Sequence, residues 1–284
     1  NLSFTKASQE LFVSQPAITK HIQELEAAYQ TRLFDRQGSR ISLTEAGKLL
    51  LEHCERILED YKRLEYEMHL LHNEYTGGLK LGASTTVAQY VLPPLLASFI
   101  GKFPHVNLSL LNGNSREIEA ALQEHRIDLG FVEGVFRLPN IKYTTFLKDE
   151  LVAVVRTGSK LAIGEEITPE ELLHLPLVLR ERGSGTLDVF ERALQQHNIK
   201  LSSLQVLMYL GSTESIKLFL EHTDCLGIVS IRSITRELYS GQLRVVEIKD
   251  MPMLRDFSFA QPQGQESGLA QVFMQFAMHY NNKL

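Results

Sequence analysis

The segment "SQPAITKHIQELEAAYQTRLFDR", from Ser14 to Arg36, decides how the first part of this 284-residue chain is interpreted. Ser14 is a favourable N-cap, and Pro16 is tolerated in a first helical turn, where its missing N–H would have no partner. Ile18, Ile22 and Leu25 recur at helical spacing and form one apolar face. Upstream, "FTKASQEL" also has helical spacing, and "FVSQ" separates the two. The pattern therefore predicts a helix, a tight turn and a second helix.

The other faces of the second helix carry polar side chains that could meet base edges and phosphates, namely Ser14, Gln15, Thr19, Lys20 and Gln23. Any capped amphipathic helix has this pattern. Contact with DNA and ordinary packing within one chain are thus both open at this point.

The next segment, "TRLFDRQGSRISLTEAG", places Arg32, Arg36 and Arg40 around Gly38 between two short apolar runs. This pattern predicts a two-stranded wing whose arginines could contact phosphates. Residues 1–42 contain only one more Lys or Arg than Asp and Glu, so local charge alone gives little support to DNA binding.

A long helix is predicted from Thr44 to about Tyr75, where no proline interrupts the pattern and Gly77 and Gly78 follow. Its apolar positions alternate between spacings of four and three residues. This heptad seam favours pairing with a second copy, although the stripe could also pack on its own chain. The seam comprises Leu50, Cys54, Ile57, Tyr61, Leu64, Met68 and Leu71.

From Leu79 onward, strand patterns alternate with helical patterns, which predicts a mostly parallel sheet covered on both faces. One series contains "LKLGAS", "VNLSLLNG" and "IDLGFVEG", with helices at about 88–102 and 115–125. A second series contains "LVAVVR", "LPLVLR", "LQVLMYLGS", "CLGIVS" and "LRVVEIK". The chain closes with "FSFAQ" and a helix from Gly268 to about Tyr280. Two α/β lobes are expected.

Composition narrows the classes of function. The formal net charge is −5, so any attraction for nucleic acid must be local, and no apolar run is long enough to cross a bilayer. Cys54 and Cys225 are isolated, and the first residues do not form a signal peptide pattern. A cytoplasmic location without membrane contact is expected.

The segment "KASQELFVSQPAITKHIQELEAAYQTRLFDRQGSRISLTEAG" resembles the winged helix-turn-helix of the LysR-type bacterial transcriptional regulators. The resemblance covers essentially the whole chain. The strings "GLKLGAS", "LPPLLASF", "GNSREI", "IDLGFVEG" and "RERGSGT" are similar to the branch with regulators of sulfur assimilation and carbon fixation. Family members have a further helix before "NLSFTKAS", so the chain is expected to be a truncated copy of a longer protein.

The resemblance implies three parts. Residues 1–43 would form an all-α winged helix-turn-helix DNA-binding domain, residues 44–76 a linker and dimerisation helix, and residues 79–284 a two-lobed α/β effector domain similar to periplasmic binding proteins. Lobe I would comprise about 79–155 plus 257–284, and lobe II about 156–256. The expected contacts with double-stranded DNA are Ser14, Gln15, Thr19, Lys20, Arg36 and Arg40, with Thr5 and Arg32 as further candidates.

Four segments place a small hydroxyl residue where a strand passes to a helix, a position that suits anions. The resemblance implies that such segments line the effector site, although helix capping explains each one equally well. The candidates are Ser84, Thr85, Thr86, Asn114, Ser115, Ser184, Gly185, Thr186, Ser212 and Thr213.

Three charged residues bear on the class of effector. Arg180 and Arg182 could neutralise an anion, or could pair with Glu181 or face solvent. Glu133 could orient a hydroxyl or amine, or could form a salt bridge across the hinge. A small anionic metabolite is favoured, while a neutral or amine-bearing effector would suit Glu133 better.

The sequence thus predicts a DNA-binding regulator that forms homodimers or homotetramers and responds to a small molecule. The alternative is a solute-binding receptor without DNA function. No nucleophile elbow, phosphate-binding loop or metal-spaced histidine pair occurs, so neither catalysis nor a metal or other cofactor is expected.

Overall fold

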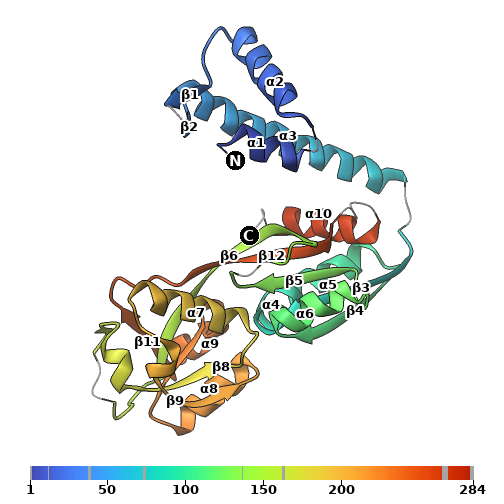
Figure 1. Ribbon diagram of the computed structural model, residues 1–284. Helices are drawn as coiled ribbons and strands as arrows, with labels where there is room; N and C mark the ends of the chain where they lie inside the picture. The colour runs from blue at the N-terminus through green and yellow to red at the C-terminus, as the bar shows by residue number, and fades with distance from the viewer. Residues whose placement is uncertain are drawn as a thin grey trace. The chain divides into compact units, whose positions relative to one another are not determined.

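The computed structural model describes residues 2–11, 13–37, 40–72, 75–135, 137–161, 164–263 and 268–281. Two compact units divide the chain, residues 1–73 and 74–284 (Figure 1). Each is described separately.

The first unit follows the predicted order of elements. Helices α1 (Phe4–Glu10) and α2 (Gln15–Ala28) precede strands β1 (Phe34–Gln37) and β2 (Arg40–Leu43), and helix α3 (Glu45–His72) follows. The two strands pair antiparallel, with Phe34 opposite Leu43, and form the expected wing. The ring of Phe4 packs edge-on against that of Phe34, with the ring centroids 5.7 Å apart. This unit is a winged helix-turn-helix followed by a long helix.

Hydrogen bonds that the side chains of Glu26 and Thr44 form with backbone groups fix the wing to its neighbours. The Glu26 side chain on α2 accepts hydrogen bonds from the backbone N–H groups of Leu33 (2.8 Å) and Phe34 (3.3 Å). Thr44 caps α3 by accepting from the Gly47 N–H and donates its own hydroxyl to the Arg32 carbonyl. A β-carbon on Gly47 would lie 2.1 Å from the Leu33 carbonyl oxygen, so glycine is required for this close approach.

In the second unit, strand and helix alternate as predicted. In lobe I, β3 (Gly77–Ser84) pairs parallel with β4 (Val106–Gly113) and β5 (Leu129–Glu133). Helices α4 (Thr85–Tyr90), α5 (Leu92–Lys102) and α6 (Ser115–Gln123) connect these strands, and α10 (Leu269–Asn281) also packs there (Figure 1). The first predicted helix of this lobe is therefore two helices, with Val91 between them. The phenylalanine rings of α5, β5 and α10 share one core, in which the ring centroids of Phe99 and Phe273 are 4.7 Å apart.

Lobe II has the same design. Strand β8 (Pro176–Arg180) lies between β9 (Gln205–Leu210) and β10 (Leu226–Ser230), parallel to both. Helices α7 (Gly185–Gln196), α8 (Thr213–His222) and α9 (Thr235–Tyr239), with strands β7 (Glu166–Ile167) and β11 (Leu243–Ile248), complete the lobe together with three short 3₁₀ segments, η1 (Glu171–His174), η2 (Leu201–Ser203) and η3 (Ile231–Ser233).

Two long antiparallel strands join the lobes, β6 (Ile141–Arg156) and β12 (Leu254–Pro262). Strand β6 pairs with β12 from Ile141 to Glu150, and from Leu151 onward with β10. Sheet pairing thus passes from one lobe to the other between Glu150 and Leu151, a few residues before the boundary expected at 155. The sequence pattern indicated only the last six residues of β6, "LVAVVR", because the ten before them, "IKYTTFLKDE", alternate poorly.

Candidate nucleic-acid interface and effector site

Helix α2 is positioned by its cap. The Ser14 hydroxyl accepts from the Ala17 N–H at 3.4 Å, and Pro16 lies in the first turn, as predicted. None of the 14 residues of α2, all of them described, is fully buried. The apolar face is half-covered at Ile18 and Ile22, while Leu25 is exposed.

The predicted DNA contacts of α2 lie together on its first turns. Gln15 and Lys20 are exposed and Thr19 is half-buried. The Thr19 hydroxyl donates to the Gln15 carbonyl at 3.1 Å, and Lys20 lies 3.8 Å from Glu24 with both side chains largely in solvent. Residues one turn apart on a helix share a face, so Gln15 and Thr19 form a polar surface beside Lys20.

The other predicted contacts are distributed over the rest of the unit. Thr5 on α1 and Arg32 before the wing are exposed. Arg36 and Arg40 belong to the two wing strands, but their side chains lie outside the described residues.

Helix α3 exposes its predicted seam. The exposed fractions are 65% for Ile57, 57% for Tyr61, 54% for Leu64 and 48% for Met68. Leu50 is half-buried and Cys54 is exposed, while the side chain of Leu71 lies outside the described residues. A large apolar stripe in water is unfavourable, so this face is suited to a partner helix.

Three of the four candidate effector segments meet at Glu133, between the two lobes of the second unit, through Thr86, Ser115 and Thr186. Thr86 of lobe I and Thr186 of lobe II both point their hydroxyls at Glu133 Oε1, at 3.3 and 3.5 Å. Glu133 is 4% exposed, and its backbone carbonyl accepts from Ser115 at 2.8 Å. Gly185 brings α7 against this strand end, since a β-carbon there would lie 2.3 Å from the Glu133 carbonyl oxygen. The lobes therefore touch directly at Glu133.

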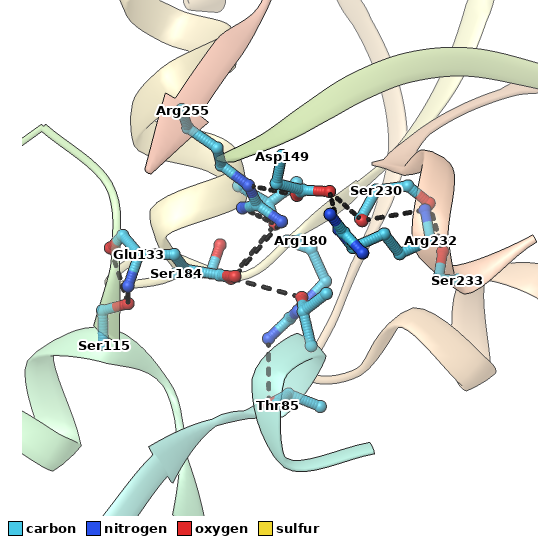
Figure 2. Close-up of polar contacts among 12 residues, drawn as sticks. Thr85, Ser115, Glu133, Asp149, Arg180, Ser184, Ser230, Arg232, Ser233 and Arg255 are labelled. Atoms are coloured by element: carbon cyan, nitrogen blue, oxygen red, sulfur yellow. Dashed lines mark hydrogen bonds and ion pairs between the residues drawn. The ribbon is translucent and has the colours of Figure 1, made fainter. Parts of the chain in front are cut away.

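A buried arginine that the sequence did not single out completes this network. Arg255 on β12 faces Glu133 Oε2 at 3.1 Å, an ion pair without hydrogen-bond alignment. It also donates to Asp149 on β6 at 2.7 Å and to the Thr186 hydroxyl at 3.0 Å. Asp149 in turn accepts from Ser230 at 2.7 Å. Figure 2 shows these side chains directed toward one another around the crossing strands. Of the two roles open to Glu133, this structure contains the salt bridge.

The predicted hydroxyl segments separate into two kinds. Asn114, Ser184 and Ser212 each cap the helix that follows, accepting from a backbone N–H at 3.0, 3.2 and 3.1 Å respectively. Capping accounts for these three. Ser84 makes no capping bond, and its buried hydroxyl has no hydrogen-bond partner in the structure. Thr85 donates to the Gly113 carbonyl at 3.2 Å, and Thr213 is buried at the start of α8.

The two candidate arginines differ completely. Arg182 is exposed, whereas Arg180 is 1% exposed and donates to Glu181 and, across the lobes, to the Thr85 hydroxyl at 3.3 Å. The pairing with Glu181 that the sequence left open for these arginines is made by Arg180.

A second group of charges connects the lobes beside α4. Lys217 on α8 contacts Glu214 and Glu237, both at 2.7 Å, and stands 5.3 Å from the ring centre of Tyr90 on α4. The Tyr90 hydroxyl donates to Glu214. Burial and then this hydrogen bond raise the pKa of Tyr90. For Glu214, burial would raise the pKa, but the hydrogen bonds from Lys217 and Tyr90 outweigh it and lower the pKa.

Of two cavities, the first borders the network at Asp149 and the second lies apart from it. One of about 440 Å³ is lined by Lys148, Asp149, Arg232 and Leu254 among others, and one of about 350 Å³ by Leu122, His125 and Pro262 among others. Among the described residues no group of three His, Cys, Asp or Glu side chains could hold a metal ion, and no helix could span a membrane.

The fold and these sites define a class, that of a helix-turn-helix DNA-binding protein with a two-lobed small-molecule domain. Residues 1–48 match the model of the bacterial regulatory helix-turn-helix protein, lysR family, and residues 72–281 match that of the LysR substrate binding domain. The chain belongs to the LysR family of transcriptional regulators, so it is a DNA-binding regulator with an effector-binding domain and not an enzyme.

Three similar proteins place the chain within the family. The uncharacterized regulator YeiE of Escherichia coli is 34% identical over 246 residues, covering 87% of this chain and 81% of YeiE. A probable RuBisCO transcriptional regulator of Cyanidioschyzon merolae is 31% identical over 277 residues, covering 96% and 91%. The structure of the Synechocystis CcmR regulatory domain in complex with 2-PG is 27% identical, with a TM-score of 0.66, and covers 74% of this chain and 99% of that domain.

Proposed function

We propose that this regulator recognises its operator through the first two turns of α2. Gln15, Thr19 and Lys20 would meet bases and phosphates in a major groove, with Thr5, Arg32, Arg36 and Arg40 on the flanking backbone. The observation that supports this most is the capped, open start of α2, where Ser14 and Pro16 fix the helix while Gln15 and Lys20 stay in solvent.

The regulator acts as a homodimer, and as a homotetramer when two dimers associate. The exposed seam of α3 supports the dimer, because a second copy would cover Ile57, Leu64 and Met68. Exposed apolar residues on the two edge strands of the second unit, Leu110 and Leu111 on β4 and Leu207 and Met208 on β9, offer further contact surface for a tetramer. A dimer would place two α2 helices in successive major grooves about one turn of DNA apart.

The effector is a small anionic metabolite bound between the lobes, at the segments 84–86, 114–115, 133, 184–186 and 212–213. The juxtaposition of Thr86, Glu133 and Thr186 from both lobes supports this placement, since an occupant there would change how the lobes meet. The buried cation Arg180 at the same junction favours an anion. A related regulatory domain binds 2-PG, which makes 2-PG a first compound to test. The complex would act on DNA in the cytoplasm.

A gel-shift assay with the DNA upstream of the neighbouring gene tests operator binding. Lys20→Ala should weaken binding to specific and unrelated DNA alike, whereas Gln15→Ala should reduce the preference for the specific site by about 1–3 kcal/mol. Lys48→Ala is the matched control, because the Lys48 side chain is also largely exposed (62% against 76% for Lys20) but lies on α3. A chain without any sequence preference would refute the assignment and favour a solute-binding receptor.

Ligand-induced thermal shifts with 2-PG, sulfate, sugar phosphates and aromatic acids test the effector site. Thr86→Val and Ser184→Ala should each weaken the affinity of a compound that shifts the melting temperature, while Ser98→Ala on the exposed side of α5 should not. Unchanged affinity in both site variants would place the effector elsewhere.

A further inference from the structure

Arg180 holds its main partner in the geometry of a ligand complex. It is the last residue of β8, and its guanidinium donates from Nε to Glu181 Oε2 at 2.8 Å and from Nη2 to Glu181 Oε1 at 3.0 Å. Two parallel bonds of this kind are how an arginine binds a free carboxylate. The carboxylate bound here belongs to the chain itself.

The same guanidinium has donors to spare. A guanidinium carries five N–H groups, and Nη1 of Arg180 is buried without a hydrogen-bond partner in the structure. The hydroxyl of Ser84, which precedes Thr85 in the chain, is also buried and unpartnered. Buried cationic donors are costly when they are left unsatisfied. This position would therefore gain from an occupant with more acceptor oxygens than Glu181 presents.

The two partners differ in how freely they can separate. Arg180 is fixed from several sides, since it also donates to the Gly211 carbonyl at 3.3 Å, and its side chain is 1% exposed. The Glu181 side chain is 26% exposed and follows the end of the strand, so it can turn into solvent. Arg255 is the other deeply buried arginine of the interlobe network, but neither of its carboxylate partners can turn into solvent. The side chains of Glu133 and Asp149 are each 1% exposed or less.

We propose that Arg180 is the anchor for the oxoanion of the effector, and that Glu181 occupies this anchor when no effector is bound. The effector's carboxylate, sulfate or phosphate group displaces Glu181 into solvent, and the further oxygens of a sulfate or phosphate group also reach Nη1. One anion replaces another, so the buried cation is never left without a counter-ion. This inference rests on the proposed function, in which an anion binds between the lobes.

The exchange also provides a route from ligand to lobe movement. Nη2 of Arg180 is shared between Glu181 of lobe II and Thr85 of lobe I. A ligand that replaces Glu181 changes the acceptors around Nη2 of Arg180. It thereby alters the hydrogen bond from Nη2 to the Thr85 hydroxyl, which is one of the bonds between the lobes. The effector then binds the lobes with different affinity when this bond is present and when it is altered. Such a difference in affinity is the requirement for a ligand-driven switch.

Calorimetric titration of the full chain with sodium sulfate and with sodium acetate, at constant ionic strength, tests the exchange. Glu181→Gln removes the competing charge and should tighten binding of at least one anion, by roughly tenfold if Glu181 fills the site nine-tenths of the time. Glu221→Gln, an exposed change of equal charge on α8, should leave both affinities unchanged. The anion that gains more identifies a tetrahedral or a planar group.

The inference is overturned if the Glu181→Gln variant binds neither anion more tightly than the unaltered chain does. This includes the outcome in which both proteins fail to bind sulfate and acetate. Adding Arg180→Lys to Glu181→Gln should abolish the increase in anion affinity, because an ammonium cannot make the two parallel hydrogen bonds. Thr86→Val separates the two levels of the proposal. If it weakens sulfate binding while Glu181→Gln has no effect, only the exchange is wrong; if neither has an effect, the placement between the lobes is wrong as well.

Discussion

Helix α3 and the junction of the two lobes depart from the usual partition of side chains in opposite directions. On α3, Ile57 and Leu64 are more than half exposed. At the junction, Glu133, Asp149 and Arg255 are ionisable and almost completely buried. A continuous exposed apolar stripe and a cluster of buried charges are both uncommon in folded chains. The two regions differ in which groups offset these unfavourable environments.

The buried charges compensate one another within the chain. Arg255 contacts Glu133 at 3.1 Å and Asp149 at 2.7 Å, and neighbouring hydroxyls supply further hydrogen bonds. The stripe of α3 has no comparable cover among the described residues of its unit, which fits the proposal that a second copy covers it. One region is thus compensated within the second unit, while the other would be half of an interface in the proposed dimer.

The largest expected effect breaks the compensated region. Arg255→Met leaves Glu133 and Asp149 buried without their cation, and should lower the free energy of unfolding by about 3–5 kcal/mol. Urea denaturation of the full chain measures this. Arg192→Met, which alters an exposed arginine on α7, should change stability by less than about 0.5 kcal/mol.

Adding Glu133→Gln and Asp149→Asn to Arg255→Met should recover part of the loss, because the uncompensated charges are then removed. A triple variant as unstable as Arg255→Met would indicate that packing, and not charge compensation, holds the junction together.

The next effect breaks the exposed region. Leu64→Asp places a charge in the α3 seam and should raise the dimer dissociation constant by about a hundredfold, equivalent to about 2.8 kcal/mol, in sedimentation experiments. Leu58→Asp is the matched control, since Leu58 is 58% exposed against 54% for Leu64 but lies off the heptad positions. Equal dimers in both variants would show that the seam is wrongly assigned.

A third, smaller effect tests how closely the lobes meet. A β-carbon at Gly185 would lie 2.3 Å from the Glu133 carbonyl oxygen, so Gly185→Ala should push the lobes apart and cost about 1–3 kcal/mol. Alanine favours a helix over glycine, so any loss must come from the contact. Small-angle scattering should give a larger radius of gyration, whereas Gly211→Ala, with open space around it, should match the unaltered chain.

Sequence patterns predicted the elements well wherever one local rule operates. The cap at Ser14, the wing, the heptad of α3 and most strands follow from spacing within a few residues. The first ten residues of β6 were missed because "IKYTTFLKDE" alternates poorly, and its partner β12 lies more than a hundred residues away. A partner so far along the chain leaves no hairpin turn as a second local signal.

The interlobe site was predicted less completely, for a related reason. The hydroxyl residues were found because they stand at strand-to-helix transitions, yet three of these positions are filled by ordinary caps. Arg255 and Asp149 carry no signal in the sequence beyond a charge within a strand. Their roles come from meeting across two distant strands, which only the tertiary fold determines.

The smallest effect concerns the charges beside α4, which bridge the lobes at a half-exposed position. Glu214 has a lowered pKa, so it stabilises the folded chain above its unfolded pKa of about 4.3, and this contribution is lost as the pH falls through the lower folded value. With its side chain 47% exposed, solvent screening limits the effect to about 1 kcal/mol or less. The stability gap between the unaltered chain and Glu214→Gln should therefore be constant from about pH 7 to pH 5 and narrow below about pH 4.3. Urea denaturation across this range measures the gap, with Glu221→Gln on the same helix expected to give none. A gap that does not narrow at all below about pH 4.3 would mean that the Glu214 charge contributes nothing to stability through its lowered pKa.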